Sequence, residues 1–223
     1  MLVSRATVED ESRWRWDEDG MKTEHPPHFV HDERFRRAYA RAVQAGTFDY
    51  GVRWRVHTLL WAAELAARQE GAFVECGTAR GYMASAICDY LDWGDRPFYL
   101  LDTFASTDRP ERPFYADAGP EPVRKNFAEW PSVRLVVGRV PDTFDRVDVD
   151  RVAFLHVDMN VPEPEEAAVR HFWPLMPSGG VIVFDDYGFA SYPESRATAD
   201  RLSRELGFSI LASATGQGLV IKS

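Results

Sequence analysis

From residue 52 onward, apolar positions switch repeatedly between helical spacing and short uninterrupted runs. Helical spacing predicts helices from 52 to a C-cap at Gly71, and over 83–91, 123–130, 163–175 and 194–206. Short apolar runs predict strands over 72–74, 98–101, 133–137, 152–157, 181–184, 208–211 and 218–221. Strands that alternate with helices indicate βαβ units and a mostly parallel sheet. Because Ala212–Gln217 is too short for a helix, the last two strands must pair as an antiparallel hairpin.

The first fifty residues are polar and carry tryptophans, and only 32–45 in this part is predicted to be helical. His25, His28 and His31 lie close together in sequence, but no cysteine or carboxylate completes a clear ligand set, so we expect structural or exposed roles. We therefore divide the chain into an N-terminal extension, 1–50, and a main α/β domain, 51–223. The extension is a candidate for ligand-site or oligomer contacts.

Composition and charge exclude several classes of function. The net charge of −9 argues against general binding to nucleic acid or to anionic membranes, because phosphate attraction needs a basic face. No apolar run approaches the ~20 residues that cross a bilayer, and the N-terminus lacks the apolar region of a signal peptide. With Cys76 and Cys88 as the only cysteines, a disulfide framework is not expected, and a reducing cytoplasm is the simplest compartment.

Carboxylates follow four of the five predicted core strands at the point where each strand ends. Glu75 and Asp102 end the first two, Asp158 ends the fourth, and Asp185 and Asp186 end the fifth. Ligands of open α/β sheets bind outside the carboxyl ends of the strands. The sequence therefore predicts a binding site at this edge.

The loop after the first strand reads Glu75-Cys76-Gly77-Thr78-Ala79-Arg80-Gly81-Tyr82, with its glycines spaced G-x-x-x-G. Gly77 would let the backbone approach a ligand and Gly81 would open the next helix, although any strand–helix turn can use glycine. The loop lacks the G-x-G-x-x-G of dinucleotide folds. Its carboxylate precedes the glycines, which suits the cationic amino end of S-adenosylmethionine and would repel a pyrophosphate.

Asp102 stands 27 residues after Glu75, at the end of the next strand. A carboxylate at this place can accept both hydroxyls of an adenosine ribose, and its alternative role is to cap a following helix. The candidate cofactor residues are Glu75, Gly77, Thr78, Gly81, Tyr82, Asp102 and Thr103.

Asp158, Asp185 and Asp186 form a second acidic group. Three neighbouring carboxylates are unfavourable unless a cation or protons neutralise them, and oxygen ligands suit Mg²⁺ or another hard divalent cation. The alternative is that these aspartates cap a helix or pair with Arg or Lys. A cation here would lower the pKa of a substrate hydroxyl, with Asp158 as both ligand and candidate base. His156, His171 and His57 are expected to be packing or surface residues, although His156 faces the same side as Asp158.

The segments FVECGTARGY, FYLLDTF, VRKNF, LHVDMN and MPSGGVIVFDDYG resemble the successive motifs of the TylF-like (macrocin/mycinamicin-type) sugar O-methyltransferases, over roughly 50–223. The resemblance implies a class I methyltransferase fold, with S-adenosylmethionine bound by Glu75, Gly77 and Asp102. It also implies Mg²⁺ held by Asp158, Asp185 and Asp186, a cytoplasmic enzyme of natural-product or antibiotic biosynthesis, and a homo-oligomer (dimer or larger). The chain departs from the family where Asp158-Met159-Asn160-Val161 replaces D-G-D-x-Y, so the methyl donor is implied more directly than a sugar acceptor.

The sequence thus predicts a metal-assisted methyltransferase that acts on a small hydroxylated acceptor. We consider as alternatives a metal-independent methyltransferase, a nicotinamide-dependent oxidoreductase and a non-catalytic binding protein.

Two further features lie outside the sheet. The polar stretch 105–122, with Phe114 and Tyr115, is a candidate mobile lid or an ordinary surface loop. Trp14, Trp16 and Trp54 are candidates for contacts between subunits.

Overall fold

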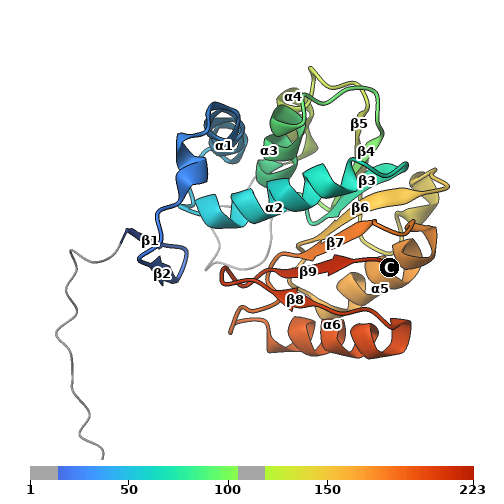
Figure 1. Cartoon of the computed structure of the whole chain (residues 1–223). Coiled ribbons are helices and arrows are strands. Elements are labelled where there is room, and N and C mark those ends of the chain that lie inside the picture. The colour runs from blue at the N-terminus through green and yellow to red at the C-terminus, as the bar shows by residue number, and fades with distance from the viewer. Residues whose placement is uncertain (1–14, 105–118) are drawn as a thin grey trace, which may run out of the picture.

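A computed structural model describes residues 15–104 and 119–223 of the chain. Its centre is a seven-stranded sheet in the order β5-β4-β3-β6-β7-β9-β8 (Figure 1). The strands are β3 (Ala72–Cys76), β4 (Phe98–Asp102), β5 (Val133–Val137), β6 (Val152–Val157), β7 (Val181–Phe184), β8 (Leu211–Ala212) and β9 (Gly218–Ile221). The pairs among β5, β4, β3, β6 and β7 are parallel, whereas β9 is antiparallel to both β7 and β8. The predicted mostly parallel sheet with an antiparallel C-terminal hairpin is confirmed.

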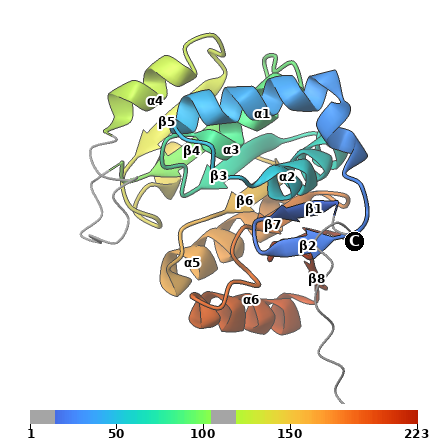
Figure 2. The ribbon, with the colours of Figure 1, turned by 90° about the vertical axis from the view of Figure 1, so that its left-hand side faces the viewer.

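Helices cover both faces of this sheet (Figures 1 and 2). They are α1 (Glu33–Gly46), α2 (Arg53–Ala66), α3 (Tyr82–Tyr90), α4 (Pro120–Asn126), α5 (Pro162–Phe172) and α6 (Pro193–Leu206). Residues of α1 to α4 share one hydrophobic cluster with one side of the strands, and residues of α5 and α6 share a second cluster with the other side. Because both faces are covered, β3, β6 and β7 are buried along their whole length, as parallel strands usually are.

Three predicted elements have wrong boundaries. The helix α4 begins earlier than expected, with a proline in its first turn, and it ends before Phe127. Strand β8 is short because Phe208, just after the left-handed Gly207, packs its ring against Trp173 in the core instead of pairing. Gly71 does not cap α2, which ends at Ala66. Gly71 has a φ of +131°, and a Cβ added to it would lie 2.8 Å from the backbone nitrogen of Ala153. Glycine is therefore required at this position by the close approach to β6.

The N-terminal extension contains α1, as predicted, and also a hairpin that the hydrophobic pattern did not predict. Strands β1 (Trp16–Glu18) and β2 (Met21–Thr23) pair antiparallel around Asp19-Gly20, whose φ angles of +53° and +69° fit a tight two-residue turn. A short 3-10 helix, η2 (His28–His31), leads to α1. Trp14 and most of the predicted lid, with Phe114 and Tyr115, lie outside the described residues. No helix in the described part is long and apolar enough to span a membrane.

Candidate active site

A cavity of about 480 Å³ opens at the carboxyl edge of the sheet. The β3–α3 loop, the ends of β6 and β7, part of α2 and the β1–β2 turn contribute to its walls. Seven predicted site residues line it, namely Glu75, Gly77, Thr78, Tyr82, Asp158, Asp185 and Asp186. The candidate cofactor group and the candidate metal group therefore share one cavity.

The β3–α3 loop is held against the ends of both neighbouring strands. On one side, the backbone N–H of Ala79 donates to Asp102 Oδ2 at 2.7 Å. On the other side, a Cβ added to Gly77, whose φ is +94°, would lie only 1.9 Å from the backbone oxygen of Asp158. The close approach that requires glycine is thus between the loop and the end of β6. The sequence suggested that Gly77 would let the backbone approach a ligand, but the contact with Asp158 requires glycine whether or not a ligand is bound.

Asp102, Thr103 and Gly81 lie next to the cavity rather than in its lining. The carboxylate of Asp102 fastens two loops, because it accepts the N–H of Ala79 and, at 2.8 Å through Oδ1, the N–H of Phe104. Thr103 is exposed, with its hydroxyl 3.4 Å from Asp102 Oδ1. Gly81 is the N-cap residue of α3, as predicted for a residue that opens the helix. A ribose-binding role for Asp102 stays a prediction.

A buried histidine connects the two predicted groups. His156 Nδ1 lies 2.8 Å from Glu75 Oε1, and His156 Nε2 lies 3.5 Å from Asp185 Oδ1. Although burial alone would lower it, hydrogen bonds with these two carboxylates raise the pKa of His156 to about 10, so the ring is protonated near neutral pH. His156 is therefore buried, as expected, but it also bridges the two acidic groups of the cavity.

The acidic group comes together around Asp185. Ligand atoms of His156, Asp158 and Asp185 lie within 4.8 Å of one another, and Asp186 lines the same cavity. Burial, together with Asp185 and Asp186, raises the pKa of Asp158 well above its usual range. Against the effect of its own burial, the Arg55 guanidinium and His156 hold the pKa of Asp185 below its usual range. Among the described residues, no cation forms an ion pair with Asp158.

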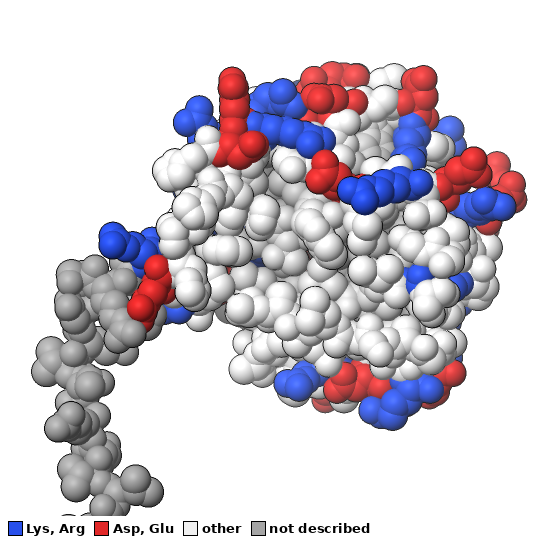
Figure 3. Space-filling view, in the orientation of Figure 1, with Lys and Arg blue, Asp and Glu red and all other residues white. Residues whose placement is uncertain are grey.

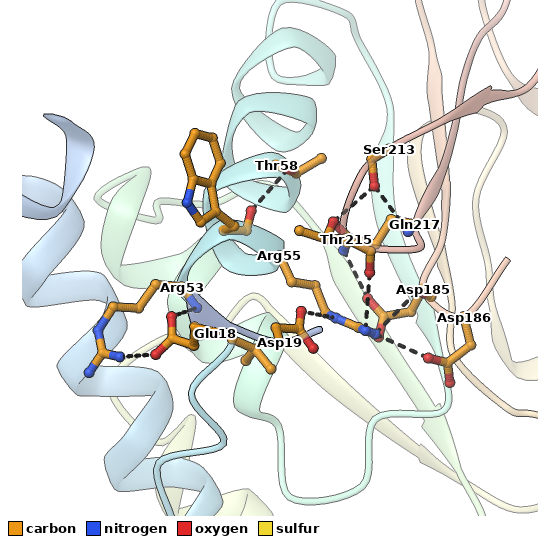
Figure 4. Close-up of polar contacts among 12 residues, drawn as sticks. Glu18, Asp19, Arg53, Arg55, Thr58, Asp185, Asp186, Ser213, Thr215 and Gln217 are labelled. Atoms are coloured by element: carbon orange, nitrogen blue, oxygen red, sulfur yellow. Dashed lines mark hydrogen bonds and ion pairs between the residues drawn. The ribbon is translucent and has the colours of Figure 1, made fainter. Parts of the chain in front are cut away.

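Arg55, on α2, is the main site residue that the sequence analysis missed. Its buried guanidinium contacts three carboxylates: Nη1 donates to Asp185 Oδ2 at 2.7 Å and to Asp186 Oδ1 at 3.1 Å, and Nε donates to Asp19 Oδ2 at 3.2 Å (Figure 4). Nη2 donates to the backbone oxygen of Thr215 at 3.3 Å. Part of the alternative considered for the aspartates, pairing with an arginine, is thus observed for Asp185 and Asp186.

Two sequence signals could have revealed this arrangement. Arg55 stands three positions after Val52 and four before Leu59, on the apolar face of its helix, where a charged residue needs buried partners. Asp19-Gly20 is a dipeptide typical of two-residue hairpin turns, and this turn carries Asp19 to the cavity.

The remaining histidines lie outside the cavity lining. His57 stacks on Phe29 with ring centroids 4.0 Å apart, and His171 stacks on Phe144 at 4.3 Å, so both have the packing role that was expected. His25, His28 and His31 are exposed.

Solved structures with the same fold are methyltransferases. The O-methyltransferase NovP matches with a TM-score of 0.69 and 17% identity, over 88% of this chain and 99% of that one. CalS11, described as a calicheamicin methyltransferase, matches with a TM-score of 0.59 and 16% identity over 74% and 77%. The O-methyltransferase TomG from Streptomyces achromogenes, solved with S-adenosylmethionine, matches with a TM-score of 0.55 and 16% identity over 88% and 95%. A comparison with curated proteins gives no significant match.

The fold is therefore that of the class I S-adenosylmethionine-dependent methyltransferases. A family model described as a methyltransferase domain matches residues 74–187, which is just over half of the chain and includes Glu75, Asp102, Asp158, Asp185 and Asp186. The chain belongs to this methyltransferase family, and it is an enzyme of methyl transfer rather than a nicotinamide-dependent oxidoreductase.

Proposed function

We propose that this enzyme transfers the methyl group of S-adenosylmethionine to a hydroxyl of a small acceptor, with help from a divalent cation such as Mg²⁺. The observation that carries the proposal is the shared cavity, with the Glu75 loop on one side and Asp158, Asp185 and Asp186 on the other. Five carboxyl groups line it (Asp19, Glu75, Asp158, Asp185 and Asp186), against two lining cations, Arg55 and Arg80. This excess of negative charge favours cationic ligands.

Unpartnered polar atoms support a site for the methyl donor. Glu75 Oε2 and Thr78 Oγ1 are buried and make no hydrogen bond of normal geometry among the described residues, although Thr78 interacts with Glu75 and opposes the rise in its pKa that burial causes. Both side chains line the cavity. Buried polar atoms normally have partners, so these favour a ligand that donates hydrogen bonds, as the amino group of S-adenosylmethionine does. We propose that the donor is bound by Glu75, Gly77, Thr78, Gly81, Tyr82, Asp102 and Thr103.

The chemistry of the acidic residues fits a hard cation. Asp158 has no ion-pair partner in the described part of the chain, and one of its carboxylate oxygens lies within 4.8 Å of a carboxylate oxygen of Asp185. Carboxylate oxygens are the ligands that Mg²⁺ prefers, and we propose Asp158, Asp185 and Asp186 as its ligands. When bound, the cation would lower the pKa of the acceptor hydroxyl and orient it.

In the proposed reaction, the acceptor oxygen bonds to the methyl carbon while the carbon–sulfur bond breaks, which leaves a neutral thioether. Asp158 takes the hydroxyl proton. Asp158 is suited to this role by its place at the end of β6, where it lines the cavity without an ion-pair partner among the described residues. The aromatic side chains of Tyr50, Phe189 and Tyr192 line the cavity and help to exclude water.

We propose a sugar or another hydroxylated natural product as the acceptor. The TylF-like motifs support this class, and so does CalS11, which is described as a TDP-rhamnose 3'-O-methyltransferase.

For the compartment we propose the cytoplasm, in keeping with two free buried cysteines. We also propose a homo-oligomer. Figure 3 shows few charged side chains in the middle of the face that carries α2, β9 and β8, and these elements include the exposed Trp61, Ile221 and Leu211.

A metal-independent methyltransferase is the second candidate, because Arg55 already neutralises part of the charge on Asp185 and Asp186. Assays of S-adenosylhomocysteine formation, with a deoxysugar nucleotide and a catechol as probe acceptors, separate the two candidates. The lead candidate predicts that chelation abolishes turnover and that Mg²⁺ restores it. Full turnover in the presence of the chelator would favour the second candidate.

Binding of the donor is tested separately by calorimetric titration with S-adenosylmethionine. Asp158→Asn should lower turnover at least a hundredfold and leave donor affinity within about threefold, because Asp158 acts on the acceptor. Asp150→Asn, at an exposed position, is the matched control and should behave as wild type. If no S-adenosylmethionine binds to the wild-type chain, the proposed cofactor site is wrong. Equal turnover of the two variants would remove Asp158 as the base.

A further inference from the structure

Both oxygens of the Asp185 side chain already have hydrogen-bond partners. Its Oδ1 accepts a hydrogen bond from Gln217 Nε2 at 2.9 Å and lies 3.5 Å from His156 Nε2. Its Oδ2 is bound by Arg55 Nη1 at 2.7 Å. A carboxylate oxygen has two lone pairs, so a cation that binds Oδ2 must either share it with Arg55 or replace Arg55 there.

Sharing that oxygen is electrostatically unfavourable. Because Mg²⁺ lies about 2.1 Å from its oxygen ligands, a cation on Oδ2 would be at most about 4.8 Å from Arg55 Nη1. Like charges at this distance in a partly buried site repel strongly. The same Nη1 also donates to Asp186 Oδ1, so both proposed ligands are affected at once.

The guanidinium of Arg55 is held in place by hydrogen bonds on all its nitrogens. Its side chain is 6% exposed, and every guanidinium nitrogen has an acceptor, including Asp19 of the hairpin and the carbonyl of Thr215 (Figure 4). Asp19 and Thr215 would still hold the guanidinium after it had left Asp185 and Asp186. Arg55 thus has a second set of partners within the same site.

We propose that Arg55 is a resident counter-ion of the Asp185–Asp186 pair and that a divalent cation binds in competition with it, so that Arg55 sets the affinity of the site for metal. This inference rests on the metal ligands of the proposed function and makes Arg55 a positioning residue. Without metal, Arg55 neutralises part of the charge of the pair. With metal, Arg55 retains Asp19 and Thr215 as partners.

The test measures metal affinity directly, by calorimetric titration of the full chain with Mn²⁺. Arg55→Met should bind Mn²⁺ at least tenfold more tightly than wild type, equivalent to ~1.4 kcal/mol. Arg37→Met is the matched control, because Arg37 also pairs with two aspartates, Asp89 and Asp92, and lies outside the cavity lining and the hairpin. It removes the same charge and should stay within threefold of wild type.

A second readout covers the case in which Arg55→Met folds poorly, since it leaves buried carboxylates uncompensated. Saturating Mn²⁺ should then raise the melting temperature of Arg55→Met by more than that of wild type. Equal or weaker Mn²⁺ affinity in a folded Arg55→Met, or no greater rescue of a destabilised one, overturns the inference and leaves the metal site intact. If neither protein binds Mn²⁺, the proposed metal site fails, and the inference fails with it.

Discussion

Gly77 offers a sharp test of how the site is built. Replacing it with alanine places a Cβ 1.9 Å from the backbone oxygen of Asp158 and 2.5 Å from its carbonyl carbon. Ordinary contacts begin near 3.4 Å, so the loop and the end of β6 must separate by about 1.5 Å. Neither atom belongs to a flexible side chain that could turn away.

The expected cost has two parts. An alanine at φ +94° is strained by ~1–2 kcal/mol, and overpacking of a close contact costs ~1–3 kcal/mol. The sum, about 2–5 kcal/mol, lowers the melting temperature of a chain of this size by roughly 4–20 °C. Because the displacement separates Glu75 from Asp158, binding of S-adenosylhomocysteine should weaken as well.

Thermal unfolding followed by circular dichroism, with calorimetric titration of S-adenosylhomocysteine, measures both effects. Gly94→Ala is the matched control, because an added Cβ there meets no atom within 4 Å. It should melt within 2 °C of wild type, or slightly higher, since alanine restricts the unfolded chain. If Gly77→Ala melts at the same temperature as Gly94→Ala, the close approach of the β3–α3 loop to the end of β6 is not what makes glycine necessary.

Two further predictions concern stability. Burial raises the pKa of Glu165 to about 7, so the folded state holds a proton where the unfolded chain is ionised, and wild-type stability should fall as the pH rises from about 4.5 to 7. Glu165→Gln removes this loss and should be more stable at pH 8 by up to ~3 kcal/mol in urea unfolding; an unchanged pH dependence would contradict the assignment. Asp32 caps α1 by accepting the N–H of Phe35 at 2.8 Å, so Asp32→Ala should cost ~1 kcal/mol, whereas Asp95→Ala at an exposed position should cost nothing measurable.

The contacts of Arg55 link the proposed metal site to the N-terminal hairpin. Asp19 reaches the cavity only because the hairpin is docked, and Arg53 and Glu18 form a second ion pair between α2 and the hairpin. The N-terminal extension therefore contributes directly to the charge of the site. That the extension also borders the acceptor site stays a proposal.

The sequence by itself determined the elements and the edge at which the chemistry gathers. Apolar runs and helical spacing are local properties, so β3, β6 and β7 were predicted within a residue or two. Carboxylates at the carboxyl ends of parallel strands lie at the same edge of the sheet. The sequence therefore predicted that Glu75 and Asp158 would line one site.

Only the tertiary structure decided which charges meet. Arg55 and Asp185 are 130 positions apart, and their contact depends on how α2 packs across the sheet. The bridge from His156 to Glu75 and Asp185 depends likewise on the register of three strands. Such pairings are set by packing between distant segments, and hydrophobic periodicity within each segment carries no information about them.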